Sequence, residues 1–136
     1  QRALSGQPIL VFGDGQQSRC FSAVHDVVRG FLLLMDTPEA KGEVFNIGSD
    51  EEITVFELAQ RIKRMCRSDS PIELMAYDRV YGQSYEDMRR RVPDLRKIRR
   101  YTGYRPQYSL DMLLEMTIRD HCEQMRIPCP VGVATA

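Results

Sequence analysis

The stretch PILVFGDGQQSRCFSAVHDVV, residues 8–28, decides the fold that we expect for this chain of 136 residues. It opens with the apolar run Pro8–Phe12, which predicts a buried strand, and the turn Gly13-Asp14-Gly15 ends that strand. Ser22 can then cap a helix that runs to about Met35, because apolar residues recur from there at helical spacing. A strand, a glycine turn and a helix in this order indicate the start of an α/β arrangement.

The rest of the chain continues to alternate strands and helices. We expect strands at Glu43–Ile47 and Pro71–Ala76, a helix from Thr54 between them, and two final helices, Asp94–Arg100 and one from Ser109. Helices between strands need crossover connections, so part of the sheet should be parallel. The sequence therefore predicts an α/β fold with a small mixed sheet and packed helices, and its length predicts one compact domain.

The helix from Thr54 has the clearest start signal. Thr54 and Glu57 form the pattern of a capping box, in which the Thr54 oxygen accepts from the Glu57 amide and the Glu57 carboxylate reaches back to Thr54. Ile53 and Leu58 occupy the two hydrophobic-staple positions around it. We therefore expect this helix to begin at Thr54.

Charge limits the classes of partner. Nineteen basic residues balance nineteen acidic residues, and a zero net charge argues against a general nucleic-acid or membrane-surface binder. Yet the segment from Asp87 to Arg105, which follows an expected polar loop at Tyr77–Asp87, holds eight basic residues against two acidic ones. This local cluster favours a small anionic ligand, and the alternative is a solvated helix face.

The positions of the cysteines and histidines do not predict a zinc site. The four cysteines, at positions 20, 66, 122 and 129, form no Cys-x-x-Cys pair, and the two histidines lie far apart. There is no apolar run of membrane length and no signal-peptide layout, so we expect a cytoplasmic protein with reduced thiols. The first residue is Gln1 rather than Met, which hints at a truncated or processed chain.

The turn Gly13–Ser18 superficially matches a dinucleotide-binding fingerprint. In such a fingerprint a helix N-terminus follows the glycines at once, so that its amides face the pyrophosphate. Here Ser18 stands in place of the third glycine, and three residues intervene before the helix. A plain turn is the preferred interpretation, and a mononucleotide-binding unit is the alternative.

Four blocks of the chain together resemble the C-terminal half of the extended short-chain dehydrogenase/reductases, the NAD-dependent nucleotide-sugar epimerases and dehydratases. The resemblance covers about residues 3–120, and its blocks are residues 8–28, residues 42–49 with 52–59, residues 90–98 with 103–106, and the helix that starts at Ser109. It implies a Rossmann-type α/β fold of which this chain is a part.

The resemblance also shows what is missing. The family's cofactor site is an N-terminal glycine-rich turn, and its catalytic centre is Tyr-x-x-x-Lys; no Tyr in this chain is followed four residues later by Lys. We therefore expect no catalytic residue, no NAD site and no metal site in this chain, and no epimerase or dehydratase activity on its own. The expected organisation is a nucleotide-sugar-binding lobe at residues 1–127, with remnants of the cofactor sheet at about 8–50, and a flexible tail at 128–136.

Substrate-binding roles are likewise implied by the resemblance. Val11 and Phe12 would meet the nucleotide base, and Asp87 would accept ribose hydroxyls, since a carboxylate accepts two hydrogen bonds at once. Two arginines would hold the diphosphate of a nucleotide sugar, most simply a UDP-sugar, through bidentate bonds. One is Arg19, and the pattern leaves open whether the other is Arg90 or Arg91.

A second function follows from the same resemblance. A chain that lacks the cofactor lobe would expose the face that packs on that lobe, and large apolar faces find partners. The predicted helix Val24–Met35 and strand Glu43–Ile47 would supply this face. The partner would be the missing N-terminal cofactor lobe or a second copy, which makes a dimeric interaction module the alternative to a substrate-binding fragment.

Overall fold

The computed structural model describes residues 1–77 and 87–131, so most of the predicted Tyr77–Asp87 loop and the end of the predicted tail lie outside the described residues. The chain divides into two compact units, and each is made of separate stretches of sequence. Unit 1 holds residues 1–18, 53–90 and 114–136, and unit 2 holds residues 19–52 and 91–113.

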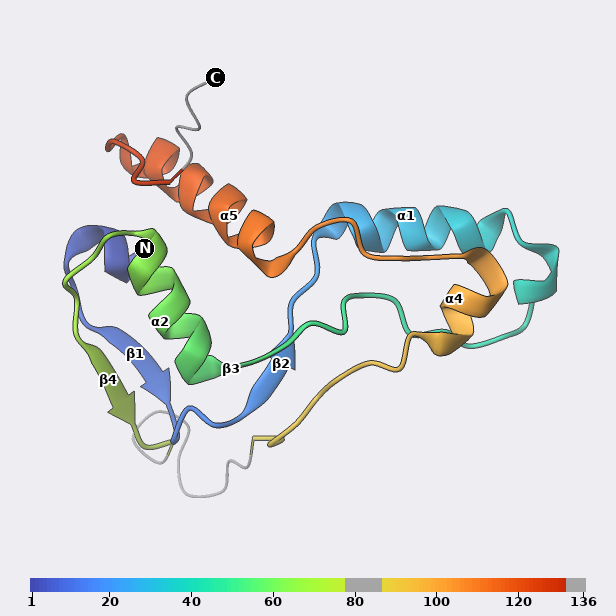
Figure 1. Ribbon diagram of the computed structural model, residues 1–136, viewed down its shortest axis with the longest axis horizontal. Coiled ribbons are helices and arrows are strands. Elements are labelled where there is room, and N and C mark those ends of the chain that lie inside the picture. Colours follow the sequence, from blue (N-terminus) through green and yellow to red (C-terminus); the bar gives the residue numbers. More distant parts are fainter. Residues whose placement is uncertain (78–86, 132–136) are drawn as a thin grey trace. The chain divides into compact units, whose positions relative to one another are not determined.

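Unit 1 is built around a pair of parallel strands. β1, Ile9–Phe12, pairs with β4, Ile72–Met75, in a register that sets Ile9 opposite Ile72 and Phe12 opposite Met75. Both strands were predicted, as was a parallel arrangement, and the long connection between them contains α2, as a parallel pair requires (Figure 1).

The helix α2, Val55–Met65, begins at the predicted capping box. The Thr54 hydroxyl oxygen accepts from the Glu57 amide at 3.1 Å, and a Glu57 carboxylate oxygen accepts from the Thr54 amide at 3.1 Å. Both bonds satisfy amides that would otherwise lack a partner in the first turn, so the start of the helix is fixed locally.

The core of unit 1 forms between α2 and the last helix. α5, Leu110–Met125, starts after Ser109, as predicted, and the Ser109 hydroxyl accepts from the Met112 amide at 3.3 Å. A short 3-10 helix at Arg2–Ser5 completes the unit. The buried cluster contains one small residue, one β-branched residue and two thiols: Ala3, Cys66, Ile118 and Cys122.

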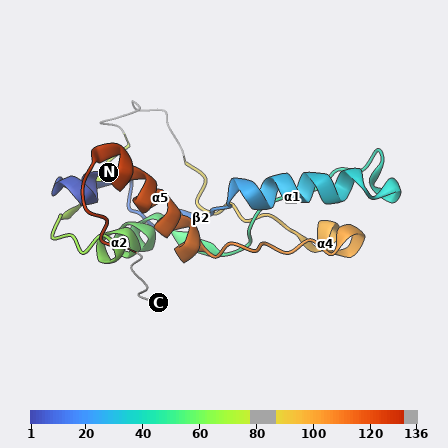
Figure 2. The same ribbon diagram turned by 90° about the horizontal axis from the view of Figure 1, so that it is seen from above.

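Unit 2 pairs α1, Val24–Met35, with α4, Arg96–Thr102, and Figure 2 shows the two helices side by side. A short 3-10 helix, Pro38–Ala40, follows α1. Gly103 ends α4, with a φ of 69° that favours glycine. The buried residues between these elements are Leu95, Ile98 and Tyr104, and Leu33, Leu34, Phe45 and Ile47 pack against them.

Two expectations for unit 2 are wrong. Residue Ala23, not Ser22, is the N-cap of α1, and the Ser22 hydroxyl instead accepts from the Ser49 amide. The segment Glu43–Ile47 has no strand geometry, because within the described residues no strand lies beside it to share its backbone hydrogen bonds. Its apolar side chains pack on the core of unit 2 all the same.

Two short strands were not predicted. β2, Ser18–Cys20, and β3, Glu52–Thr54, form a second two-stranded sheet, and each has only three residues. Runs this short show no alternation of apolar and polar residues, so periodicity cannot detect them.

The outer surface of α1 is unusually apolar. Five of its side chains are mostly exposed, from 51% at Val28 to 79% at Met35, and the others are Val24, Phe31 and Leu32. The buried positions of the helix are Asp26 and Gly30. Among the described residues, no helix combines the length and the apolar character needed to cross a membrane.

Candidate functional site

A pocket of about 540 Å³ lies entirely within unit 2. Three segments line it: the end of β2 with the residues up to Ser22, the loop Asn46–Ser49, and Arg91–Pro93. They belong to three of the four sequence blocks that carry the family resemblance, and folding brings them together.

Two arginines line this pocket, Arg19 from β2 and Arg91 from the segment that precedes α4. Of the described residues that line it, none is acidic, and Ser22, Asn46 and Ser49 add neutral hydrogen-bonding groups. The described lining thus carries two guanidinium groups and no carboxylate, which suits an anion with several oxygens.

The wall of the pocket at Gly48 cannot tolerate a side chain. Gly48 has a φ of 151°, and a Cβ there would lie 2.9 Å from the Ser22 hydroxyl oxygen. That oxygen accepts a 2.7 Å hydrogen bond from the Ser49 amide, and the Ser49 hydroxyl accepts in turn from the Glu51 amide at 3.1 Å. These local bonds hold the loop close to Ser22 and so fix the shape of the pocket.

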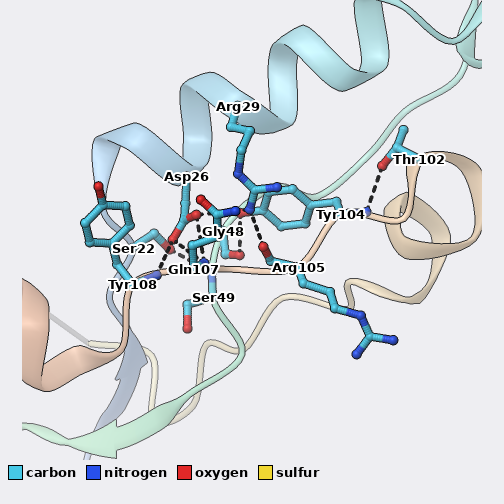
Figure 3. A network of polar contacts seen from close by, with 10 residues as sticks. All are labelled: Ser22, Asp26, Arg29, Gly48, Ser49, Thr102, Tyr104, Arg105, Gln107 and Tyr108. Carbon is cyan, nitrogen blue, oxygen red and sulfur yellow. Dashed lines mark hydrogen bonds and ion pairs between the residues drawn. The ribbon is translucent and has the colours of Figure 1, made fainter.

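Asp26 anchors the neighbouring backbone of unit 2 (Figure 3). Its side chain is 1% exposed and accepts hydrogen bonds from the Gln107 amide at 2.9 and 3.0 Å and from the Tyr108 amide at 3.0 Å. Arg29 donates to the same carboxylate at 3.1 Å. Burial by itself raises the pKa of Asp26, but these hydrogen bonds and the Arg29 charge outweigh it and hold the pKa below its usual range.

Tyr104 ties this network to the pocket wall. Its side chain is fully buried, and its hydroxyl donates to the Gly48 carbonyl at 2.9 Å (Figure 3). α1 can approach because Gly30 has no side chain: a Cβ there would lie 2.6 Å from Ile47 and 3.2 Å from the Tyr104 ring. The pocket-lining loop Asn46–Ser49 therefore packs against α1 and is hydrogen-bonded to Tyr104.

The other predicted substrate-binding residues belong to unit 1. Val11 is 1% exposed and takes part in the β1–β4 ladder, while Phe12 is half-buried and its carbonyl accepts from the Gln17 side chain at 2.9 Å. Gln17 also donates to the Tyr77 hydroxyl at 2.9 Å, and Tyr77 donates to Asp87 at 2.9 Å. These hydrogen bonds link the end of β1 to Asp87, the residue that is predicted to bind the ribose.

The two candidate arginines occupy different places. Arg91 lines the pocket with Arg19, whereas Arg90 is in unit 1, where it forms an isolated parallel bridge with Ser18. Its neighbour Arg89 forms an ion pair with Asp14 at 2.5 Å, which with the Gln16 amide lowers the pKa of Asp14. Of the two candidates, Arg91 is therefore the one that lines the pocket, and the choice of phosphate ligand stays a prediction.

The glycine turn after β1 has no phosphate-binding geometry. The chain continues from it into β2 rather than into a helix. The nearest helix start is that of α2, and its Val55 and Phe56 amides donate to the carbonyls of Gln17 and Gly15 at 3.0 Å. These amides are already used, which argues against the mononucleotide-binding alternative.

Sequence reasoning did not predict a role in the site for most of the pocket lining, including Ser22, Asn46, Gly48 and Ser49. Their two blocks were recognised as similar to the family, but the residues give no chemical signal until folding brings them beside the arginines. Among the described residues, no cluster of histidine, cysteine, aspartate and glutamate is arranged to hold a metal ion.

Comparison with known proteins defines the class: the chain is related to the NAD-dependent nucleotide-sugar epimerases and dehydratases, the extended short-chain dehydrogenase/reductases. Within that class, the chain belongs to the GDP-mannose 4,6 dehydratase family, whose model matches residues 1–117. The predicted family is therefore confirmed.

Similar curated proteins act on UDP-sugars, as their names state. A UDP-N-acetyl-alpha-D-glucosaminuronate decarboxylase from Bacillus cytotoxicus is 37% identical over 86% of this chain and 36% of its own length. UDP-glucuronic acid decarboxylase 1 from Danio rerio is 35% identical over 87% of this chain and 26% of its own length. The chain thus spans about a third or less of the length of these relatives.

Solved structures confirm the predicted α/β fold class. A UDP-glucose 4-epimerase from Thermotoga maritima, solved with UDP-glucose, matches with a TM-score of 0.79 at 30% identity, over 91% of this chain and 38% of that one. An epimerase from Methanothermobacter thermautotrophicus matches with a TM-score of 0.78 at 28% identity, over 92% of this chain and 37% of that one.

Proposed function

We propose that this chain is the nucleotide-sugar-binding part of an NAD-dependent sugar-nucleotide enzyme, and that its ligand is a UDP-sugar. The observation that carries the proposal is the pocket in unit 2 that Arg19 and Arg91 line together without an acidic residue among its described lining. In this proposal residues 1–127 form the binding lobe, with remnants of the cofactor sheet at about 8–50, and residues 128–136 form a flexible tail.

The diphosphate is the part of the ligand that the pocket suits best. Each guanidinium can donate two parallel hydrogen bonds to phosphate oxygens, and these charge-assisted bonds are about twice as strong as neutral ones. The Ser22 and Asn46 side chains and the fixed Gly48 loop supply neutral groups around the same space. The UDP-sugars named for the curated relatives support uridine as the base.

Three residues of unit 1 complete the proposal. Asp87 would accept the ribose hydroxyls in place of the Tyr77 hydroxyl that it now binds. Val11 and Phe12 would meet the base, and Phe12 is the better exposed of the two. Arg90 remains the alternative to Arg91 as the second phosphate ligand.

Binding without turnover is the expected behaviour. In the complete family enzyme NAD accepts a hydride from the sugar while the tyrosine of Tyr-x-x-x-Lys removes a hydroxyl proton. This sequence has no Tyr-x-x-x-Lys, so the chain by itself should bind a UDP-sugar and leave it unchanged.

Isothermal titration with UDP tests the proposal. Replacement of Arg19 or Arg91 by Ala removes a charged hydrogen-bonding partner worth about 1.5–3 kcal/mol, so UDP affinity should fall roughly 10- to 150-fold. Arg100→Ala is the matched control, because Arg100 is an exposed arginine of α4 that does not line the pocket. Equal affinity in Arg91→Ala and Arg100→Ala would remove the basis of the proposal.

Further titrations separate the alternatives. A loss of affinity in Arg90→Ala but not in Arg91→Ala would move the diphosphate to the other arginine, and a loss in Asp87→Asn is expected if Asp87 binds ribose. UDP-glucuronate against UDP-glucose tests the sugar. Binding of NAD without UDP would support the mononucleotide-binding alternative instead.

A second candidate function is a self-associating module, and the exposed apolar side of α1 favours it. Val24, Val28, Phe31, Leu32 and Met35 recur along one side of the helix and are all more than half exposed. Zero net charge means that copies of the chain do not repel one another strongly. A stable dimer that binds neither UDP nor NAD would favour this candidate over the first.

A further inference from the structure

Three of the four cysteines meet in the core of unit 1. Cys66, at the C-terminal end of α2, and Cys122, in the last turns of α5, are buried at 8% and 1% exposure. Cys129 is half-buried and packs against the same cluster. All three are free thiols in this structure.

The end of α5 brings Cys129 back to this core. α5 ends at Met125, and Arg126 adopts a left-handed conformation with a φ of 54°. The Arg126 amide donates to the Glu123 carbonyl at 3.1 Å, and the Ile127 amide donates to the Cys122 carbonyl at 3.0 Å. This is the reversal of a Schellman-type helix end, and it returns the following residues toward the helix that they have just left.

The reversal returns Cys129 to the buried cluster that contains Cys122. Cys129 packs against this cluster, and so do its neighbours Ile127 and Val131. A metal would be the other use of neighbouring cysteines, but the described residues contain no cluster arranged to hold one. Two thiols in the same cluster, one buried and one half-buried, are an arrangement from which a disulfide can form.

We propose that Cys122 and Cys129 are an oxidisable thiol pair whose disulfide fastens the reversed C-terminal segment to α5. With a peroxide as oxidant, the half-buried Cys129 attacks the O–O bond as its thiolate and becomes a sulfenic acid, and one water leaves. The Cys122 thiol then loses its proton as its sulfur attacks the Cys129 sulfur, an S–S bond forms, and the hydroxyl leaves with that proton as a second water. The two thiols lose two electrons and two protons, and the peroxide is reduced to two waters.

The environment favours Cys129 as the first thiol to react. Burial raises the pKa of the Cys122 thiol, and the Cys129 thiol raises it further, so Cys122 remains protonated at neutral pH. Burial likewise raises the pKa of Cys66. Reaction with a dissolved oxidant therefore begins at the more exposed thiol, and Cys122 acts as the resolving partner.

The experiment treats the full chain with hydrogen peroxide, alkylates the remaining thiols and digests it with trypsin without reduction. Cleavage after Arg119 and Arg126 separates Cys122, in residues 120–126, from Cys129, in residues 127–136, and Cys66 leaves in residues 65–67. Mass spectrometry should find the first two peptides joined, with a mass that is two hydrogens below the sum of their reduced masses. The Tm should rise by roughly 5 °C on oxidation, because the bond restricts the unfolded chain.

Two variants keep the test decisive. Cys66→Ser should still form the joined peptide and gain the Tm shift, whereas Cys129→Ser should lose both, and its site is exposed enough to accept a hydroxyl. A link between Cys66 and Cys122, a link only between two copies of the chain, or full alkylation of Cys122 and Cys129 after oxidation would each overturn the proposal.

Discussion

The carboxylate of Asp26 joins α1 to a segment of chain that lies 81 and 82 residues further on. It is nearly inaccessible to water, and two amides together with Arg29 are its hydrogen-bond donors. A buried carboxylate is stable only with such donors, and buried amides need such an acceptor.

Replacement of Asp26 by Asn should therefore lower the free energy of unfolding by about 2–3 kcal/mol. The N–H₂ group of the carboxamide would face the Gln107 or Tyr108 amide, so that two donors would meet. The substitution would also leave Arg29 without its counter-charge. Urea unfolding followed by circular dichroism measures this change. Asp36→Asn is the control, since Asp36 is exposed at the other end of α1. An equal effect of the two substitutions would contradict the anchoring role.

The Asp26 carboxylate should also make the free energy of unfolding depend on pH. Its pKa in the folded chain is below its usual range, whereas in the unfolded chain it should be about 3.9. The stabilisation from this carboxylate is thus complete above about pH 4 and is lost as the pH falls through the lower folded value. Unfolding free energies measured from pH 6 to pH 2 should fall less steeply in Asp26→Asn than in the unmodified chain, and parallel slopes would count against this assignment.

Residue patterns nearby in sequence were predictable, and contacts between distant residues were not. Thr54 and Glu57 are three positions apart, so their mutual bonds follow from the sequence. Nothing in the sequence indicated the anchoring role of Asp26, because the amides that donate to it belong to residues 107 and 108. Likewise, the sequence could not show which of the adjacent residues Arg90 and Arg91 lines the pocket, because this depends on the path of the folded backbone.

At the scale of the element, α2 shows how far local signals determine structure. Thr54→Ala removes the acceptor for the Glu57 amide and should lower the free energy of unfolding by about 1 kcal/mol. Thermal unfolding measures it, and the control is Gln60→Ala, an exposed position within the same helix where Ala is at least as good a helix former. A Thr54→Ala chain as stable as the control would mean that tertiary packing alone fixes the start of α2.

Other elements depart from the patterns that predicted them. The apolar spacing in α1 correctly predicted a helix, but it did not show that the fully buried positions of this helix would be Asp26 and Gly30. Leu33 and Leu34 pack on the core of unit 2, whereas five other apolar side chains of the helix are mostly exposed. Glu43–Ile47 has the composition of a strand, yet a strand also needs a neighbour to accept and donate its hydrogen bonds. Strand propensity therefore failed at Glu43–Ile47, because the described chain supplies no neighbouring strand there.

At the scale of the whole molecule, the division into two units could not be read from the sequence. Each unit combines stretches that are distant in the chain, and no linker composition marks the points where the chain passes from one to the other. The family, by contrast, was predictable, because four ordered blocks carry it regardless of the contacts that they make.

The exposed side of α1 leads to a prediction for the assembled state. If two copies bury these side chains against each other, each of Phe31 and Leu32 contributes about 1.5–3 kcal/mol, so Phe31→Glu with Leu32→Glu should abolish the dimer. Light scattering across a range of concentrations measures the mass.

Both residues are more than half exposed, so the variant should keep the circular dichroism spectrum of the unmodified chain. Arg100→Glu, at an exposed position of α4, is the control and should remain dimeric. An unmodified chain that stays monomeric at every concentration would contradict self-association and leave the paired-arginine pocket as the basis of function.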